Sequence, residues 1–255
     1  MVNIERQRKI MELFLGNSFL SVKHLRDQLF FSEATIRRDL ENLEQQGLIR
    51  RIRGGAISNS GSSIETPLAV RVSENNTEKR RIAKKATELV RDNDVVFLDG
   101  STTTMEMIPF LSSKVNLTVI TNCLRTATMI ADQIKCKLIC TGGTYHRSTA
   151  SLSGPFAESC VAMKFADIFL FSVQSVDSKN GLTDQGEEIA HLKSIMMRQA
   201  KSIVLLADAS KFGRTAFCKV APLSAINTII TNRSNILDED CWNEYRSKIV
   251  YAEEN

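Results

Sequence analysis

Residues 18–57 have the sequence SFLSVKHLRDQLFFSEATIRRDLENLEQQGLIRRIRGGAI, and this stretch decides how the chain is interpreted. Apolar residues recur there at intervals of three and four in two segments, Val22, Leu25 and Leu29 in the first and Ile36, Leu40 and Leu43 in the second. This spacing predicts two short helices, each with one apolar stripe. Phe30, Phe31 and Ser32 would form the turn between them. Ser32 suits an N-cap, because its hydroxyl can accept a backbone N–H that the first helical turn leaves unpaired, so we expect the second helix to begin near Glu33.

The face of the second helix opposite its apolar stripe is polar. At 100° per residue, this face carries Ala34, Arg38, Glu41, Asn42 and Gln45, with Thr35 and Arg37 at its flanks. In a helix-turn-helix, the N-terminal residues of the second helix contact base edges. The predicted DNA-contacting set on this helix is therefore Ser32, Glu33, Ala34, Thr35, Arg37 and Arg38. Arg38 is the expected reader of guanine, because its forked donors match O6 and N7.

An arginine-rich ribbon is predicted after this helix. Gly47 is expected to end the helix, and residues 48–57 then indicate two strands joined by a glycine turn. Arg50, Arg51 and Arg53 would lie along DNA phosphates. Residues 1–57 hold ten Lys and Arg against seven Asp and Glu, a net of +3 within a chain total of +4, which favours contact with phosphates.

Together these features predict a winged helix-turn-helix that binds double-stranded DNA. The alternative is a small helical bundle with a solvated basic face. That alternative requires paired helices, a capped turn, a basic exposed face and an arginine-rich ribbon to coincide by accident.

The same stretch resembles the signature of DeoR-type bacterial transcriptional regulators. In that signature a serine, a threonine, the run IRRDL and a terminal GGA recur, and this chain has Ser32, Thr35, Ile36–Leu40 and Gly54–Ala56 at matching positions. The chain departs at Phe31, where the family often has valine. We expect this change to alter packing under the turn more than base contact.

A second domain is predicted beyond a polar connector. The run Ser58–Ser63 and a stretch around Pro67 indicate a boundary, so the expected domains are 1–57 and 77–255 with a linker over 58–76. After a helix over roughly 77–91, β-rich runs alternate with helical patterns, at Val95–Leu98, Leu117–Ile120, Leu138–Cys140, Ile168–Phe171, Ile203–Leu206 and Thr228–Ile230. This alternation predicts an α/β fold, namely a Rossmann-like, mainly parallel sheet with helices on both faces.

Small, hydroxylated and charged residues follow five of these strands, at Asp99–Thr104, Thr121–Asn122, Thr141–Gly143, Ser172–Gly181 and Asp208–Lys211. In open parallel sheets, ligands bind beyond the carboxyl ends of the strands. Gly100 permits a tight turn, and Ser101–Thr104 would begin a helix running through Met105–Leu111, a geometry that suits an anionic phosphate. Lys193 and Lys211 would add positive charge. The alternative is that GSTTT only caps a helix.

This region is also similar to the effector-sensing domain of DeoR-type regulators, in the segments LDGSTTT, TVITN, TGGTYHRSTASLSG, GLTDQGEE and LLADASKFG. The resemblance implies a fold related to ribose-5-phosphate isomerase and a phosphorylated sugar, or a metabolite derived from one, as effector. By this resemblance Ser101, Thr102, Thr103 and Thr104 would hold the phosphate, with Thr121, Asn122, Gly142, Gly143, Asp177, Gly181 and Lys211 around the rest. Where the family commonly shows G-x-x-G-x-D, the segment Ser172–Asp177 keeps the aspartate and loses both glycines. We expect Gln174 and Ser175 to narrow or repolarise the site, so that the effector differs from those of close relatives or binds weakly.

Several classes of protein are excluded by composition. No apolar run approaches the roughly 20 residues that span a bilayer, and the N-terminal MVNIERQRK lacks the apolar core of a signal peptide, so we expect a cytoplasmic protein. Six cysteines form no C-x-x-C pair, and the three histidines lie far apart. We therefore expect no metal and no cofactor.

The sequence thus predicts a regulator of transcription, specifically a repressor of a carbohydrate-utilisation operon. A homo-oligomer is expected, because one small DNA-binding module makes too few contacts for operator-grade affinity. One alternative is a sugar-phosphate isomerase with Asp177 and Glu187 or Glu188 as acid and base, although such an enzyme has no use for residues 18–57, and no catalytic residue is predicted. The other is a C-terminal domain that only oligomerises. The segments 228–230 and 238–251, the latter with Trp242, are expected at the sheet edge, in a subunit contact or in ordinary core packing.

Overall fold

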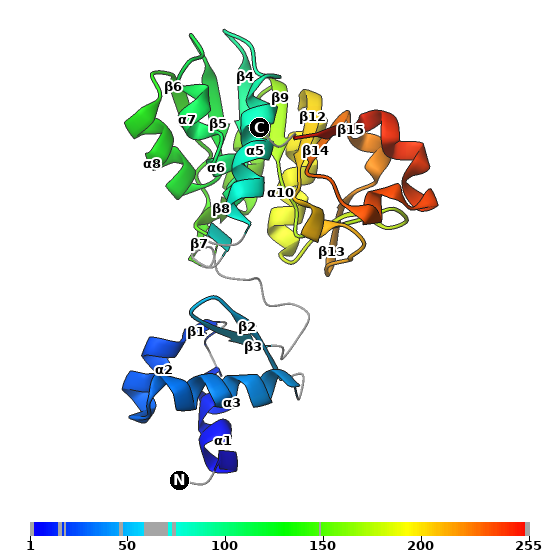
Figure 1. Cartoon of the computed structure of the whole chain (residues 1–255). Helices are drawn as coiled ribbons and strands as arrows, with labels where there is room; N and C mark the ends of the chain where they lie inside the picture. The colour runs from blue at the N-terminus through cyan, green and yellow to red at the C-terminus, as the bar shows by residue number, and fades with distance from the viewer. Residues whose placement is uncertain are drawn as a thin grey trace. The chain divides into compact units, whose positions relative to one another are not determined.

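The structure, a computed structural model, describes residues 3–14, 17, 19–45, 48–58, 71–72, 75–147 and 149–252. The chain divides into two compact units, Met1–Ser73 and Glu74–Asn255 (Figure 1). The predicted linker over 58–76 falls largely outside the described residues. Its first residue belongs to the last strand of the first unit, and its last residue begins the first helix of the second unit.

The first unit is a winged helix-turn-helix. Its elements are α1 (Asn3–Phe14), β1 (Phe19–Ser21), α2 (Val22–Leu29), α3 (Glu33–Gln45), β2 (Ile49–Ile52) and β3 (Gly55–Ser58). The strands form an antiparallel sheet in the order β1-β3-β2. Both predicted helices and the predicted ribbon are confirmed, whereas α1 and β1 were not predicted. Ile10 and Phe14 of α1 complete the core by packing with the apolar stripes of α2 and α3.

The turn between α2 and α3 forms as expected. The chain leaves α2 at Phe30, which adopts a left-handed conformation with φ +58°. Ser32 Oγ accepts the backbone N–H of Thr35 at 3.2 Å, and α3 begins at Glu33. Gly47, the predicted stop of α3, lies outside the described residues.

The two neighbouring glycines of the ribbon are required for different reasons. Gly54 has φ +88°, a conformation that glycine adopts without steric cost, and it makes the turn between β2 and β3. At Gly55 a Cβ atom would lie 2.2 Å from the carbonyl oxygen of Leu20, because β1 pairs directly beside it. The sequence GGA therefore encodes a turn followed by a close approach of two strands.

The second unit contains a seven-stranded, fully parallel sheet in the order β15-β14-β12-β9-β4-β5-β6. The strands are β4 (Val95–Leu98), β5 (Thr118–Thr121), β6 (Lys137–Cys140), β9 (Ala166–Phe171), β12 (Ala200–Leu206), β14 (Thr228–Thr231) and β15 (Ile249–Tyr251). All six predicted strands are present, and the predicted α/β fold class is confirmed. The expectation that β14 lies at the edge is wrong, because β15 pairs with it and takes that position.

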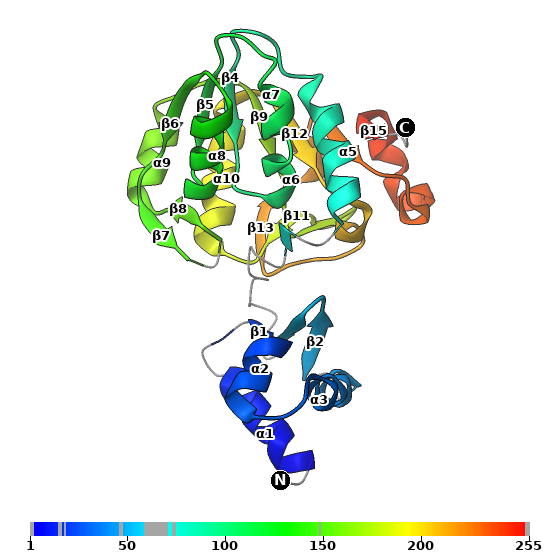
Figure 2. The ribbon, with the colours of Figure 1, turned by 60° about the vertical axis from the view of Figure 1, so that its left-hand side comes forward.

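Helices cover both faces of this sheet (Figure 2). The first face is covered by α5 (Asn76–Thr87), α6 (Thr102–Met105), α7 (Ile108–Leu111) and α8 (Leu124–Gln133), and the other by α9 (Pro155–Ala162) and α10 (Glu187–Arg198). Within β4, Val96 and Leu98 belong to the first core layer and Phe97 to the second. The strand therefore alternates between two apolar layers, which is why its sequence shows no polar alternation.

Two helix predictions need correction. The helix predicted over 77–91 ends at Thr87, because the N–H groups of Leu89 and Val90 turn back to carbonyls three residues earlier. The single helix predicted through Met105–Leu111 is two short helices, α6 and α7. Pro109 has no N–H to continue the α-helical ladder.

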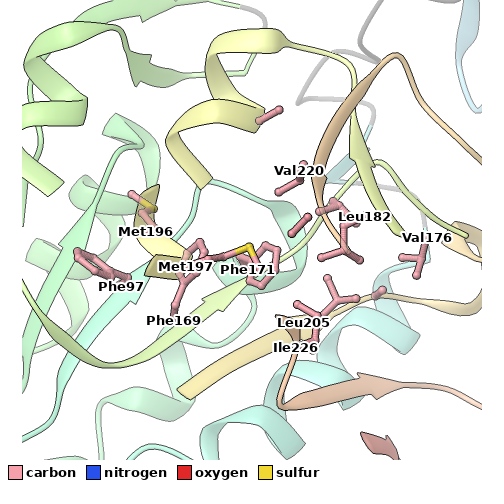
Figure 3. Packing of buried hydrophobic residues seen from close by; sticks show 14 of the residues in the cluster. Phe97, Phe169, Phe171, Val176, Leu182, Met196, Met197, Leu205, Val220 and Ile226 are labelled. Atoms are coloured by element: carbon pink, nitrogen blue, oxygen red, sulfur yellow. The ribbon is translucent and has the colours of Figure 1, made fainter. Parts of the chain in front are cut away.

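Smaller β elements lie at the carboxyl ends of the sheet strands, at the lower end of the second unit in Figure 1. They are the hairpin β7 (Thr144–His146) with β8 (Ser151–Ser153), and an antiparallel sheet of β10 (Ser175–Asp177), β11 (Gly181–Asp184) and β13 (Cys218–Ala221). The core runs without interruption from Phe97 and Phe169 to Val176, Leu182 and Val220 of this small sheet (Figure 3). The loops at the strand ends therefore rest on a rigid base.

The C-terminal part contains four 3₁₀ segments, η1 (Ala209–Lys211), η2 (Leu223–Ala225), η3 (Asn235–Asp238) and η4 (Asp240–Lys248). Trp242 of η4 is 1% exposed, and its ring meets that of Phe212 edge-on with centroids 5.3 Å apart. Trp242 thus serves core packing. Across the described ranges, no helix combines the length and the apolar character that crossing a bilayer requires.

Candidate nucleic-acid interface and ligand-binding loops

The predicted DNA-contacting face of α3 is exposed. Glu33, Ala34, Arg37 and Arg38 are exposed, and Thr35 is half-buried. Arg37 lies 3.7 Å from Glu33, which also pairs with Arg26 at 3.4 Å. Arg38 forms no ion pair with any residue that the structure describes. Its guanidinium is therefore available for a partner outside the chain.

A groove of about 740 Å³ lies beside α3 and the turn of the ribbon, with Val22 of α2 also in its wall. Arg37 of α3 and Arg51 and Arg53 of the ribbon line it, together with Gly54 and Gly55 at the turn. Three of the predicted DNA-contacting arginines thus meet around one concave surface. Arg50 is exposed but does not line this groove.

Arg51 also fixes the ribbon to α3. Its backbone N–H donates to Glu44 Oε1 at 2.7 Å, and its Nε donates to Glu44 Oε2 at 2.8 Å. A second carboxylate, that of Glu41, lies 3.6 Å from the guanidinium. These hydrogen bonds, first that from the backbone of Arg51, lower the pKa of Glu44. The guanidinium of Arg51 therefore already pairs with acids of α3, and Arg53 is the more available of the two arginines for a DNA phosphate.

A buried ion pair that was not predicted supports the first unit. Asp39 is completely buried, and its Oδ1 accepts from Nη2 of Arg6 in α1 at 2.9 Å. The hydrogen bond that Arg6 donates to Asp39 raises the pKa of the Arg6 guanidinium, which also lies 4.9 Å above the ring of Phe31. The aspartate of the IRRDL run thus joins α3 to α1. Phe31 packs partly against the core under the turn, as expected for the residue at which this chain departs from the family signature.

At the carboxyl ends of the sheet strands, Lys193 is buried among acids. Its Nζ lies 2.6 Å from Asp184 and 3.5 Å from Asp99, and donates to the carbonyl of Ser172 at 2.7 Å. Its positive charge is therefore largely neutralised within the protein. Asp99 and Asp184 were not among the predicted site residues, although both stand at the ends of buried strands, where an acid signals a partner.

The GSTTT loop is ordered by its own hydroxyl groups. Ser101 Oγ accepts the N–H of Thr104 at 3.2 Å, and the hydroxyl of Thr104 donates to Asp99 Oδ1 at 2.9 Å. Thr102, Thr103 and Thr104 are buried, at 7%, 2% and 0% exposure. The Thr104 hydroxyl therefore supports the loop from within. The groups of this loop best suited to a ligand are the first N–H groups of α6, which have no intrahelical acceptor.

The next two loops hold the hairpin β7–β8. Asn122 donates from its amide to the carbonyl of Leu152 at 3.2 Å, and Thr121 Oγ1 accepts the N–H of Cys123 at 3.2 Å. Gly142 and Gly143 both have positive φ, +71° and +112°. A Cβ at Gly143 would lie 2.4 Å from the carbonyl oxygen of Ser153. Gly100 likewise leaves room for Cys123, because a Cβ at position 100 would lie 2.6 Å from the Cβ of Cys123.

A cluster of three polar side chains that was not predicted lies beside Gly143. His146 Nε2 lies 2.6 Å from Ser153 Oγ and 3.0 Å from Glu188 Oε2, and the Ser153 hydroxyl also donates to Glu188. The hydrogen bond from Ser153, with the neighbouring His146, lowers the pKa of Glu188. Both contacts of His146 use the same nitrogen. The cluster therefore lacks the arrangement of a serine hydrolase, in which the two ring nitrogens contact different partners.

The loop that lacks the family glycines sends its two valines into the core. Val173 and Val176 are buried at 4% and 0% exposure, whereas Gln174 is half-buried. Asp177 Oδ1 accepts the N–H groups of Lys179 and Asn180 at 3.1 and 2.7 Å, and so closes the turn before Gly181. Gly181 has φ +80°, and Lys211 is half-buried in η1.

The predicted site residues thus form two groups, one around α3 and the ribbon and one at the strand ends of the second unit. Among the described residues, no three or more histidine, cysteine, aspartate or glutamate side chains are grouped so as to hold a metal ion.

Comparison with known proteins gives matches along most of the chain. Residues 6–62 match the family model of the DeoR-like helix-turn-helix domain, and residues 74–233 match that of the DeoR C terminal sensor domain. The chain is 37% identical over 247 residues to the HTH-type transcriptional regulator GlpR of Haloferax volcanii, which covers 97% of this chain and 96% of the relative. It is 35% identical over 214 residues to the L-fucose operon activator of Haemophilus influenzae, covering 84% and 86% of the two chains. It is 30% identical over 250 residues to the transcriptional repressor AccR of Agrobacterium fabrum, covering 97% of each chain.

Among solved structures, the chain is similar to ribose 5-phosphate isomerase A of Methanocaldococcus jannaschii. The sequence identity is 19%, the TM-score is 0.40, and the match covers 55% of each chain.

Proposed function

Because this chain belongs to the DeoR family of helix-turn-helix transcriptional regulators, which are not enzymes, we propose that it represses a carbohydrate-utilisation operon in the cytoplasm and responds to a phosphorylated sugar. The first unit binds operator DNA, and the second binds the effector at the carboxyl ends of its sheet strands. Relatives carry names of both kinds, an activator and a repressor, so the sign of regulation is part of the proposal.

The observation that carries the DNA-binding part is the groove beside α3 and the turn of the ribbon. It is lined by Arg37, Arg51 and Arg53, and the exposed face of α3 beside it carries Arg38. Arginines along a ribbon neutralise phosphates without reading sequence, whereas an arginine on the recognition helix distinguishes bases. We assign Arg53 to the first role and Arg38 to the second. Glu33, Ala34 and Thr35 complete the base-facing set, and Arg50 and Arg51 the phosphate-facing set. Ser32 and Arg37 are the other residues that we expect to contact DNA.

The support for an anionic effector comes from the start of α6. Ser101 caps this helix, and the neighbouring N–H groups without intrahelical acceptors suit a phosphate. Gly100, Thr102 and Thr103 shape this loop. Around the rest of the effector we place Thr121, Asn122, Gly142, Gly143, Gln174, Asp177, Gly181, Lys193 and Lys211.

We further propose a homo-oligomer. In a dimer, two recognition helices can bind two half-sites that lie one helical turn of DNA, or a multiple of it, apart. A single module makes too few contacts to bind an operator tightly.

The DNA-binding part is tested with Arg38→Ala in fluorescence anisotropy on operator and scrambled duplexes. Loss of a bidentate guanine contact is expected to weaken operator binding by about 1 to 3 kcal/mol and to leave scrambled DNA almost unaffected. Equal loss on both duplexes contradicts the base-reading role. A reporter strain supplies the sign of regulation, since deletion of a repressor raises expression.

The effector part is tested by calorimetry with ribose 5-phosphate, glucose 6-phosphate, fructose 1-phosphate, fructose 6-phosphate and glycerol 3-phosphate. Ser101→Asp keeps an N-capping side chain but sets a negative charge against the phosphate, whereas Ser101→Asn keeps the cap without the charge. We expect the first variant to abolish binding of the best ligand and the second to retain most of it. If none of these ligands binds the unmodified protein, the proposed effector class fails.

A further inference from the structure

The point where the chain enters the second unit is fastened to a loop at the strand ends. Asn75 directly precedes α5, and its side-chain amide donates to Asp208 Oδ1 at 3.0 Å and to Ser210 Oγ at 3.3 Å. Asp208 follows β12, 133 residues further along the chain. We call Asn75, Asp208 and Ser210 the clasp.

Only one of the two carboxylate oxygens of Asp208 accepts hydrogen bonds in the clasp. The residue is 2% exposed, and its Oδ1 accepts from Asn75 and from both the N–H and the hydroxyl of Ser210. Its Oδ2 is also buried, and no group among the described residues donates a hydrogen bond to it. A buried carboxylate oxygen without a donor is unfavourable and calls for a partner.

The loop of Asp208 lies next to the other proposed effector loops. β12 pairs with β9, which leads into the loop from Ser172 to Asp177, and a β-bridge joins Val176 of that loop to Phe212. On the other side, Asn232 Oδ1 accepts the N–H of Ala209 at 2.8 Å. The loop is therefore held by its neighbours on both sides, and its unsatisfied oxygen belongs to the same end of the sheet as the proposed effector site.

We propose that Asp208 recognises a hydroxyl group of the effector through Oδ2 and, through Oδ1 and Asn75, transmits its occupancy to the segment that joins the two units. This inference rests on the proposed function as a sugar-phosphate sensor. A carboxylate repels the phosphate, so Asp208 selects the neutral, hydroxyl-bearing carbon chain of the ligand. A ligand held at the strand ends changes operator affinity through the clasp, because the clasp fixes the point at which the chain enters the second unit.

Two substitutions separate these roles. In Asp208→Asn the amide oxygen still accepts from Asn75, while the amide nitrogen replaces the acceptor at Oδ2. We expect the Kd for the tightest ligand of the calorimetric panel to rise at least tenfold, with operator affinity unchanged. In Asn75→Gly the amide is lost but the backbone, at φ +50°, is easily accommodated. We expect its ligand Kd to stay within twofold, its operator affinity to fall at least threefold, and the ligand no longer to change operator affinity.

A matched control exists at Asn116, which has φ +57° and donates from its amide to Asn93 Oδ1 at 3.3 Å. Asn116→Gly is expected to behave as the unmodified protein in every measurement, and circular dichroism of each variant reports on folding.

Each outcome decides a separate part of the proposal. If Asp208→Asn binds the ligand normally, the role of Oδ2 is overturned. If Asn75→Gly keeps the full ligand response, the role of the clasp in coupling is overturned. If no panel ligand binds the unmodified protein, the proposed effector class fails instead. The role of the clasp is then tested by operator affinity alone. Equal operator affinities of Asn75→Gly and Asn116→Gly overturn that role.

Discussion

Asp39→Ala is expected to destabilise the DNA-binding unit and to leave the stability of the second unit unchanged. Asp39 is completely buried, and its carboxylate holds Arg6, whose side chain is only 12% exposed. Removing the carboxylate takes away the buried acid that pairs with the Arg6 guanidinium. It also removes one of the contacts between α1 and α3, whose apolar side chains remain packed together.

The expected magnitude follows from this burial. Breaking one partner of a buried ion pair costs about 3 to 5 kcal/mol, and the slight exposure of Arg6 favours the lower end, about 3 kcal/mol. At roughly 0.05 to 0.15 kcal/mol per residue, a unit of this size has a total stability of only about 4 to 11 kcal/mol. Since 1 kcal/mol shifts the Tm of so small a domain by about 4 to 8 °C, we expect its melting transition to fall by about 12 °C or more.

The single tryptophan of the chain makes the assay specific. Trp242 lies in the second unit, so its fluorescence follows that unit, whereas far-ultraviolet circular dichroism follows both. Asp39→Ala is expected to lower an early dichroism transition and to leave the fluorescence transition in place. Glu33→Ala is the control, because its ion pairs with Arg26 and Arg37 are exposed and are worth at most about 1 kcal/mol. A change within about 1 kcal/mol for Asp39→Ala, or an equal shift of the fluorescence transition, refutes the reasoning.

Three further outcomes are expected. Arg53→Ala is expected to weaken operator and scrambled DNA alike and to reduce the slope of log K against log salt by about one, and a loss confined to the operator contradicts a phosphate contact. The lowered pKa of Glu188, caused first by the Ser153 hydrogen bond, stabilises the fold above the ordinary glutamate value of 4.5, and this stability is lost as the pH falls below that value. Glu188→Gln should therefore flatten the acid limb of stability against pH in chemical denaturation, and an unchanged limb counts against the cluster. Trp242→Ala is expected to cost about 3 to 5 kcal/mol without changing the mass in light scattering, whereas dissociation at unchanged stability places Trp242 in a subunit contact.

In the first unit, local periodicity was sufficient for some elements and not for others. The stripes of α2 and α3 repeat over two turns and are easily recognised. In the described part of α1, Ile10 and Phe14 are the buried apolar side chains, at 0% and 5% exposure, and two such positions do not establish a period. Asp39 was predicted only as part of a family run, because its partner Arg6 is 33 residues away and no local pattern links them.

In the second unit, the strands were predictable because burial on both faces produces continuous apolar runs. β15 has three residues, and its place at the edge depends on pairing with a strand from another part of the chain. The loops at the strand ends were also predictable in position. The partners of their charged residues were not predictable. Lys193 was expected to add positive charge to the site, and no local pattern indicates that Asp99 and Asp184 pair with it, because tertiary packing decides which acids surround a lysine.

The carboxylates at the strand ends are arranged for recognition rather than for acid–base catalysis. A general base near neutral pH needs a free carboxylate with a raised pKa. Asp177 is occupied by two backbone N–H groups, and Asp99 and Asp184 are held by Lys193. The pKa of Glu188 is shifted downward, opposite to the direction that catalysis requires. Among the carboxylates that the structure describes, Asp208 is the one with a buried oxygen that accepts no hydrogen bond, and a neutral hydroxyl satisfies such an acceptor without any transfer of a proton. The sugar phosphate that we propose as effector would then be bound and released unchanged, which is what a sensor of metabolite concentration requires.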